Sequence, residues 1–223
     1  MYKIEDIINK VHCADCLSFM KKIPDDSIDL VLTDPPYGDN IGYGRMGKKI
    51  ENNEDETINY KMLDIVWNKM KDNTNLYLFT NWKFEIKLRN YIEKYTKFNI
   101  RMLLVVVKNN FGMGYSFRNQ YELCLVLEKG KPKYNKNDFS NVLYMQYINH
   151  TKDTHPHEKS KNILSKMIEH SSIKGDIVLD CFAGSGSHLV AAQALGRNFI
   201  GVEISEKYCE IARQRLNQMP LPF

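Results

Sequence analysis

The stretch that most constrains the fold is residues 176–205, DIVLDCFAGSGSHLVAAQALGRNFIGVEIS. An apolar run ends in Asp180, a glycine-containing turn and a helical pattern follow, and a second apolar run ends in Glu203. This order predicts the first βαβ unit of a nucleotide-binding sheet. The glycines of such a unit let a ligand approach the backbone, and an acid about 20 residues later accepts hydrogen bonds from ribose hydroxyls. The sequence therefore predicts a nucleoside ligand between Gly184 and Glu203.

The glycine turn also limits which nucleoside is bound. A dinucleotide fingerprint needs a third glycine, but Leu189 stands at that position, and the chain has no GxxxxGK[ST] loop for a triphosphate. A nucleoside with a small charged tail remains, and S-adenosylmethionine has that shape. Ser187 is expected to cap the helix that follows.

Further apolar runs alternate with helical patterns along the chain. Helices are expected in NYKMLDIVWNKM and HLVAAQAL. Strands are expected at residues 28–33, 76–80, 101–107, 121–127, 177–180 and 198–202. The alternation predicts an α/β fold with a doubly wound, mostly parallel sheet.

Length and composition limit the number of domains and the class of protein. With 223 residues and 43% apolar residues, one domain with insertions is expected, and a net charge of +4 says little about nucleic acid. The first residues lack the apolar core of a signal peptide, and no segment approaches a membrane span, so we expect a soluble cytoplasmic protein without membrane contact. Five scattered cysteines indicate reduced thiols, and Cys13 and Cys16 lack a second ligand pair, so no metal is expected.

Two stretches interrupt the alternation. Residues 38–57 are rich in glycine and then in charge, which predicts a mobile loop. Residues 109–157, interrupted by the strand at 121–127, mix basic and aromatic side chains, which is typical either of a nucleic-acid surface or of solvated loops. Candidate phosphate contacts, each with the alternative of a solvated face, are Arg45, Lys48, Lys49, Arg118, Lys131, Lys133 and Lys136.

The segment TDPPYGDN, residues 33–40, follows the first of these apolar runs. Two prolines end a strand because they cannot donate to a sheet, and Tyr37 could simply pack over the strand end. Together with DCFAGSGS, however, TDPPYG resembles the amino-methylating DNA methyltransferases, in particular the permuted beta-type group, in which the catalytic motif precedes the cofactor motif. HCADCLSFMKKIPDDSIDLVLTDPPY, GYSFRNQYELCLVLEKGKP and THPHEKS are similar to other segments of that group. The departures are Cys181, Ser187, Glu158 and Ser160, where the group commonly has Pro, Thr, Gln and Pro.

The resemblance implies a Rossmann-like S-adenosylmethionine-dependent methyltransferase domain over residues 1–223, with residues 109–157 as a target-recognition region. Asp34 and the carbonyl of Pro35 would accept hydrogen bonds from the target amine, Pro36 would add rigidity, and Tyr37 would stack on the flipped base. S-adenosylhomocysteine would be the product. The implied cofactor contacts are Asp15, Cys16, Asp34, Lys159, Asp180, Phe182, Ala183, Gly184, Ser185, Gly186, Ser187 and Glu203. Asp15 is equally well explained as a helix N-cap.

The resemblance implies methylation of adenine N6 in double-stranded DNA, because serine in place of Asp34 would favour cytosine. The alternatives are cytosine-N4 methylation, methylation of RNA or of a protein amide, and a non-catalytic nucleic-acid-binding module. A homodimer and a cognate restriction endonuclease are further candidate partners. Arg118 and Glu122 match an F-R-x-x-x-E pattern of the group and are expected either to pair with each other or to meet DNA.

Overall fold

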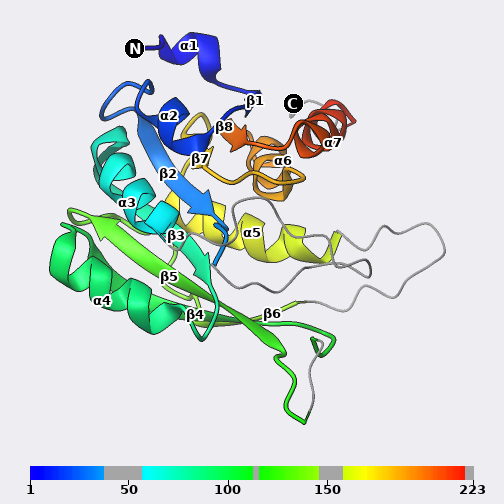
Figure 1. Cartoon of the computed structure of the whole chain (residues 1–223). Coiled ribbons are helices and arrows are strands. Elements are labelled where there is room, and N and C mark those ends of the chain that lie inside the picture. The colour runs from blue at the N-terminus through cyan, green and yellow to red at the C-terminus, as the bar shows by residue number, and fades with distance from the viewer. Residues whose placement is uncertain (38–56, 113–115, 146–157, 219–223) are drawn as a thin grey trace.

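A computed structural model describes residues 1–37, 57–112, 116–145 and 158–218 of the chain (Figure 1). The strands of this part are β1 (Lys10–Cys13), β2 (Ile28–Thr33), β3 (Met70–Thr80), β4 (Asn99–Val107), β5 (Tyr121–Lys129), β6 (Val142–Tyr144), β7 (Ile177–Asp180) and β8 (Asn198–Glu203). The helices are α1 (Ile4–Ile7), α2 (Cys16–Met20), α3 (Thr57–Lys69), α4 (Glu85–Tyr95), α5 (Glu158–Ser171), α6 (Ser187–Ala194) and α7 (Glu206–Asn217).

The strands form one sheet in the order β1-β8-β7-β2-β3-β5-β4-β6. The pairs from β1 through β8, β7 and β2 to β3 are parallel, whereas β5 runs antiparallel to both β3 and β4. β6 pairs parallel with β4 at the edge. The predicted mostly parallel α/β sheet is confirmed.

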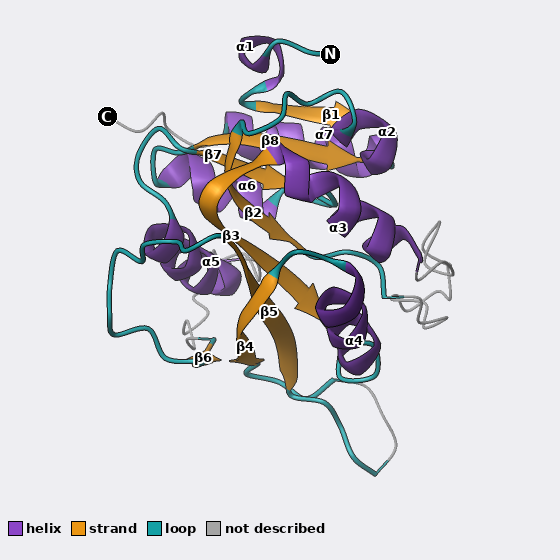
Figure 2. Ribbon diagram, turned by 90° about the vertical axis from the view of Figure 1, so that its left-hand side faces the viewer, coloured by secondary structure: helices purple, strands orange, loops and turns teal. Residues whose placement is uncertain are grey.

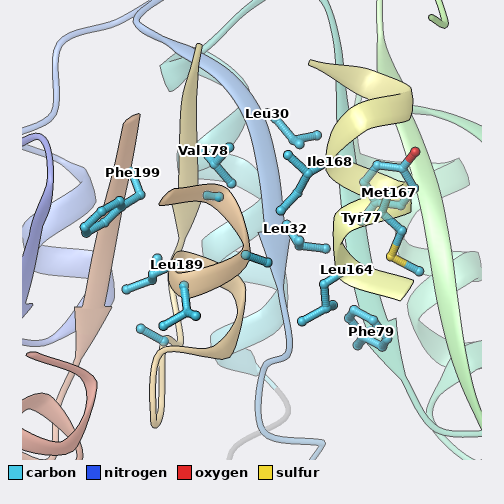
Figure 3. Close-up of a cluster of buried hydrophobic side chains, with 14 of the residues drawn as sticks. Leu30, Leu32, Tyr77, Phe79, Leu164, Met167, Ile168, Val178, Leu189 and Phe199 are labelled. Carbon is cyan, nitrogen blue, oxygen red and sulfur yellow. The ribbon is translucent and has the colours of Figure 1, made fainter. Parts of the chain in front are cut away.

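Helices cover both faces of the sheet, with α5 and α4 on opposite sides (Figure 2). Apolar side chains of α5, α6 and α7 pack on one face, for example Leu164, Leu189 and Ala212. Those of α2, α3 and α4 pack on the other, for example Phe19, Leu63 and Leu88. Figure 3 shows the first of these cores, where α5 and α6 meet the strands. Two buried layers on one sheet are what makes the fold doubly wound.

The connections diverge between β7 and β2. From β7 the chain crosses through α6 to β8, on one side of β7, whereas from β2 it passes through α3 to β3, on the other side of β2. In open α/β sheets the crevice at such a switch point, outside the carboxyl ends of the strands, is where ligands bind. The topology thus marks one place on the sheet independently of any motif.

The fold differs from the expectations in the start of β3 and in the two short strands β1 and β6. β3 begins at Met70 rather than at residue 76, because pairing with β2 and β5 holds its polar first half in the sheet despite low strand propensity. β5 is the strand that was expected to interrupt residues 109–157, and it is an inner strand of the sheet, so two separate segments flank it. The short strands β1 and β6 were not expected from the sequence. They contain four and three residues, which is too few to show a pattern of apolar and polar positions typical of a strand.

Most of the expected loop 38–57 lies outside the described residues. No helix in the described ranges is long and apolar enough to cross a membrane.

Candidate active site

A pocket of about 180 Å³ opens at the carboxyl edge of the sheet beside the switch point. Asp34, Glu122, Ser187 and His188 supply its polar wall, and Phe79, Val106 and Leu164 are among its apolar residues. Small-molecule sites usually measure roughly 300 to 1,000 Å³. The pocket therefore suits one planar ring system rather than a whole nucleoside cofactor.

Asp34 follows the last residue of β2, and the hydroxyl of Tyr37 donates a hydrogen bond to its carboxylate. The side chain is accessible from the pocket, yet the protein atoms around it exclude enough water to raise the pKa of Asp34 to about 6. The hydrogen bond from Tyr37 and the charge of His188 lower the pKa and oppose this effect. Asp34 is thus an acceptor held close to its point of protonation.

The two prolines are fixed by a residue that the sequence did not reveal. Asn59 of α3 is fully buried and donates through Nδ2 to the Pro36 carbonyl at 2.8 Å. Within the described ranges the carbonyl of Pro35 accepts no hydrogen bond. An asparagine on an amphipathic helix has no sequence signal that would reveal this contact.

Asp180 joins the two motifs. Its carboxylate accepts hydrogen bonds from Thr33 Oγ1 at 2.8 Å, from the Phe182 backbone N–H at 3.1 Å and from His188 Nδ1 at 2.8 Å. The residue is 0% exposed. These bonds give Asp180 the role of holding the end of β2 against the glycine turn, and its predicted contact with a cofactor stays a prediction.

The glycine turn fits a nucleoside ligand. Glu203 accepts the Gly184 N–H at 2.9 Å and the Ser205 N–H at 2.8 Å, and this fixes the turn and keeps the carboxylate at the end of β8. Gly184 has a positive φ of 50°, and a Cβ built on it would meet nothing within 4 Å. The open side of the turn and the acid at its rim form a cradle in which a ligand can lie against the backbone.

The start of α6 differs from the prediction. Gly186, with φ at 81°, is the N-cap, and Ser187 is the first helical residue, so Ser187 does not cap the helix. Its hydroxyl instead lies 3.2 Å from Nη1 of Arg215, which also donates to the Ser185 carbonyl at 2.6 Å. Arg215 lies in α7, and these contacts hold the glycine turn against that helix. Arg215 belongs to no recognisable sequence motif, so this contact could not be predicted from the sequence.

Gly186→Ala is expected to lower the free energy of unfolding by roughly 2 kcal/mol, since an added Cβ would be strained at φ 81° and would lie 2.9 Å from the Ala212 Cβ. Chemical denaturation measures the change. Gly175→Ala is the matched control, because Gly175 also has a positive φ, 88°, but open space around it. Equal losses in the two variants would show that the contact with Ala212 does not matter.

The N-terminal block meets the same edge of the sheet. Asp15 caps α2, accepting the Ser18 N–H at 2.8 Å, which confirms the N-cap reading. It lies next to Glu203 in the fold, because β1 pairs with β8 so that Cys13 faces Glu203. Cys16 is buried, and burial raises the pKa of its thiol to about 12, so its side chain belongs to the core.

The basic residues that were candidates for phosphate contacts lie at opposite ends of the strands. β5 runs antiparallel to β3. Its first residues therefore lie at the end of the sheet where Asp34 is, and its last residues lie at the opposite end. Arg118 precedes β5 and is therefore on the side of the site, whereas Lys131 and Lys133 follow it and are on the far side. This position argues against contacts of Lys131 and Lys133 with DNA at the site.

The remaining candidates have other outcomes. Glu122 pairs with Lys108 at 2.5 Å and Lys136 with Glu169 at 3.6 Å, whereas Arg118 has no ion-pair partner among the described residues. Arg45, Lys48, Lys49 and the side chain of Lys159 lie outside what the structure describes. The same described part holds no group of three or more His, Cys, Asp or Glu residues that could bind a metal ion.

Comparison with known proteins gives consistent matches. A family model of DNA methylases, of the N6/N4 type, matches residues 28–214. The type II methyltransferase M.HinfI of Haemophilus influenzae is 30% identical over 97% of this chain and 70% of its own length. The crystal structure of the M1.HpyAVI–SAM complex is 25% identical, with a TM-score of 0.68 over 92% of this chain and 98% of that one. The cytosine-N4-specific PvuII DNA methyltransferase, 15% identical, shares the fold with a TM-score of 0.70 over 94% of this chain and 87% of its own.

Proposed function

Since this chain belongs to the N6/N4 DNA methylase family, we propose that it transfers a methyl group from S-adenosylmethionine to the N6 amine of a flipped adenine in double-stranded DNA. The single observation that carries the proposal is the hydrogen bond between Thr33 and Asp180, which joins the strand end bearing Asp34 to the glycine turn. An amine acceptor and a nucleoside cradle thereby share one edge of the sheet. The order of the two motifs supports the permuted beta-type group.

The cradle supports S-adenosylmethionine as the cofactor. A solved neighbour, M1.HpyAVI, is a complex with SAM, and the fold covers nearly the whole of both chains. In this chain Glu203 would receive the ribose, and the open side of Gly184 would admit the methionine end. When bound, S-adenosylmethionine supplies an electrophilic methyl group on a sulfonium sulfur.

The residues at the end of β2 would activate the amine. The lone pair of an exocyclic adenine amine is delocalised into the ring, and hydrogen bonds accepted from both N–H groups draw it back onto nitrogen. Asp34 would accept one, and the Pro35 carbonyl, held in direction by the rigid prolines and Asn59, the other. Because the Tyr37 hydroxyl already bonds to one oxygen of Asp34, the amine would use the second oxygen or displace Tyr37.

The proton is lost after the methyl group has moved. The nitrogen then carries one proton too many, and Asp34 is the acceptor in reach, returning the proton to solvent. Tyr37 offers its ring to the extruded base, as enzymes that act on a base must take it out of the stack. Most of the acceleration would come from alignment and from preorganised acceptors rather than from a strong base.

The hairpin between β4 and β5 is the surface that we propose for DNA. It projects from the edge of the sheet that bears Asp34 (Figure 1). Phe111 is 65% and Phe117 95% exposed, and Arg118 follows directly. Exposed aromatic rings beside a cation suit stacking on bases and contact with phosphate.

Cytosine-N4 methylation is the second candidate. It is favoured by the fold likeness to PvuII DNA methyltransferase, which is cytosine-N4-specific. The aspartate at position 34 supports adenine, because the resemblance places serine there in enzymes that act on cytosine. A homodimer and a companion endonuclease stay predictions.

Incubation with labelled S-adenosylmethionine and unmethylated DNA, followed by digestion to nucleosides, tests the proposal. We expect N6-methyladenine as the labelled product. N4-methylcytosine would overturn the adenine assignment and keep the family. Single-molecule sequencing of DNA from cells expressing the protein would report the base and the recognition site together.

A further inference from the structure

His188 lines the same pocket as Asp34, yet the proposed reaction leaves it without a role. It is the second residue of α6, and its Nδ1 lies 2.8 Å from Asp180 Oδ2. Its ring stacks on Phe79, with centroids 5.7 Å apart and planes at 12°. Two neighbours thus fix the ring, and within the described ranges its Nε2 has no hydrogen-bond partner.

The charges around the pocket single out His188. Three carboxylates surround it, those of Asp34 at the end of β2, Glu122 in β5 and Asp180 in β7. Lys108, the residue directly after β4, pairs with Glu122 at 2.5 Å, which leaves the other two without a lysine or arginine partner in the described part of the chain. Asp180 is 0% exposed, and a buried carboxylate needs a counter-charge. An imidazolium at His188 supplies it.

Burial alone would lower the pKa of His188. The charge of Asp180, the hydrogen bond to it, and the charges of Asp34 and Glu122 outweigh burial and raise the pKa above its ordinary value. The protonated ring is therefore the favoured form in the acid range in which Asp34 titrates.

We propose that His188 is a positioning residue for methyl transfer: held by Asp180 as an imidazolium, it keeps Asp34 ionised and able to accept the hydrogen bond of the target amine. The inference rests on the proposed function and deepens it. It also gives the buried Asp180 a second role, because the same carboxylate that holds Thr33 holds the cation in the pocket that Asp34 also lines.

The first test is the pH dependence of single-turnover methylation. His188→Asn keeps a donor for Asp180 but no cation, so we expect the acid limb of the rate to move up by about one pH unit. The variant should then be about five-fold slower than the wild type at pH 6 and within about two-fold at pH 8.5. The KM for S-adenosylmethionine should not change. His170→Asn is the matched control, because His170 lies in α5 against Tyr134 and outside this pocket.

The second test needs neither cofactor nor DNA. Carboxyl NMR of ¹³C-aspartate-labelled protein should show Asp34 titrating near pH 6 in the wild type and about one unit higher in His188→Asn. Imidazole NMR should show His188 titrating lower in Asp180→Asn. His188→Gln, which also lacks the cation, repeats both readouts if the asparagine variant does not fold.

The outcomes separate the two proposals. A wild type that methylates DNA, together with an unmoved acid limb and an unmoved Asp34 titration in a folded His188 variant, overturns the role of His188 alone. A wild type that transfers no methyl group overturns the proposed function, and the NMR titrations still decide whether His188 controls the ionisation of Asp34.

Discussion

Asp34→Ala is expected to lower the single-turnover rate of DNA methylation by at least about 10³-fold while the Kd for S-adenosylmethionine changes by less than about two-fold. The reason is that the variant loses the charged acceptor for the amine, whereas the cradle around Gly184 and Glu203 is untouched. Rapid-quench assays measure the rate, and calorimetry measures the affinity. The matched control is Asp72→Ala, an exposed carboxylate at the opposite edge of the same sheet. Activity that survives in Asp34→Ala would refute the mechanism.

The melting temperature of the same variant tests whether misfolding is the cause. The pKa of Asp34 is raised in the folded protein, to about 6, so the ionised carboxylate destabilises the fold. The destabilisation due to Asp34 is absent below the pKa that this carboxyl has in the unfolded chain, and it grows as the pH rises through about 6. Removing the carboxylate should therefore leave the melting temperature at pH 8 unchanged or higher. A lower melting temperature would contradict this account of the site.

Glu203→Ala is expected to weaken S-adenosylmethionine binding by about 100-fold. The change removes the acceptor that we assign to the ribose, and it releases the Gly184 and Ser205 N–H groups that fix the turn. Hydrogen bonds to a charged group contribute about 1.5 to 3 kcal/mol each, which sets the size of the effect. Titration calorimetry without DNA measures it.

The control for this second prediction is Glu206→Ala, which removes an exposed carboxylate from the first turn of α7 and should leave the affinity unchanged. With saturating S-adenosylmethionine the Glu203 variant should recover a methylation rate near that of the wild type, because the Asp34 side of the pocket is intact. A lowered rate with unaltered affinity would place Glu203 in the reaction instead of in binding.

The sequence predicts this fold well where patterns are local. The apolar runs before Asp34, Asp180 and Glu203 became β2, β7 and β8, and the glycine turn before α6 lies where its spacing indicated. These features follow from residues a few positions apart. The polar start of β3 could not be predicted, because only its two neighbours in the sheet hold it there.

The residues that support the site were not predictable for a related reason. Asn59, Arg215 and the bond between Thr33 and Asp180 act across long separations, 147 residues in the case of Thr33 and Asp180. A motif tells which side chains carry the chemistry, but the groups that hold them come from whichever element packs alongside. The direction of β5 likewise decided which lysines lie near the site, and no residue pattern fixes that direction.

The strand order also determines when the protein can fold during its synthesis. β1 pairs with β8 and β2 with β7, although each partner is made long after the first strand has left the ribosome. Until then β2 has an open edge on the side of β7, and the carboxylate that holds Thr33 does not yet exist. Such long-range pairing makes folding slow. The nascent chain therefore carries Thr33 without the Asp180 carboxylate that joins the two motifs, and a growing polypeptide cannot modify DNA before its synthesis has passed α6.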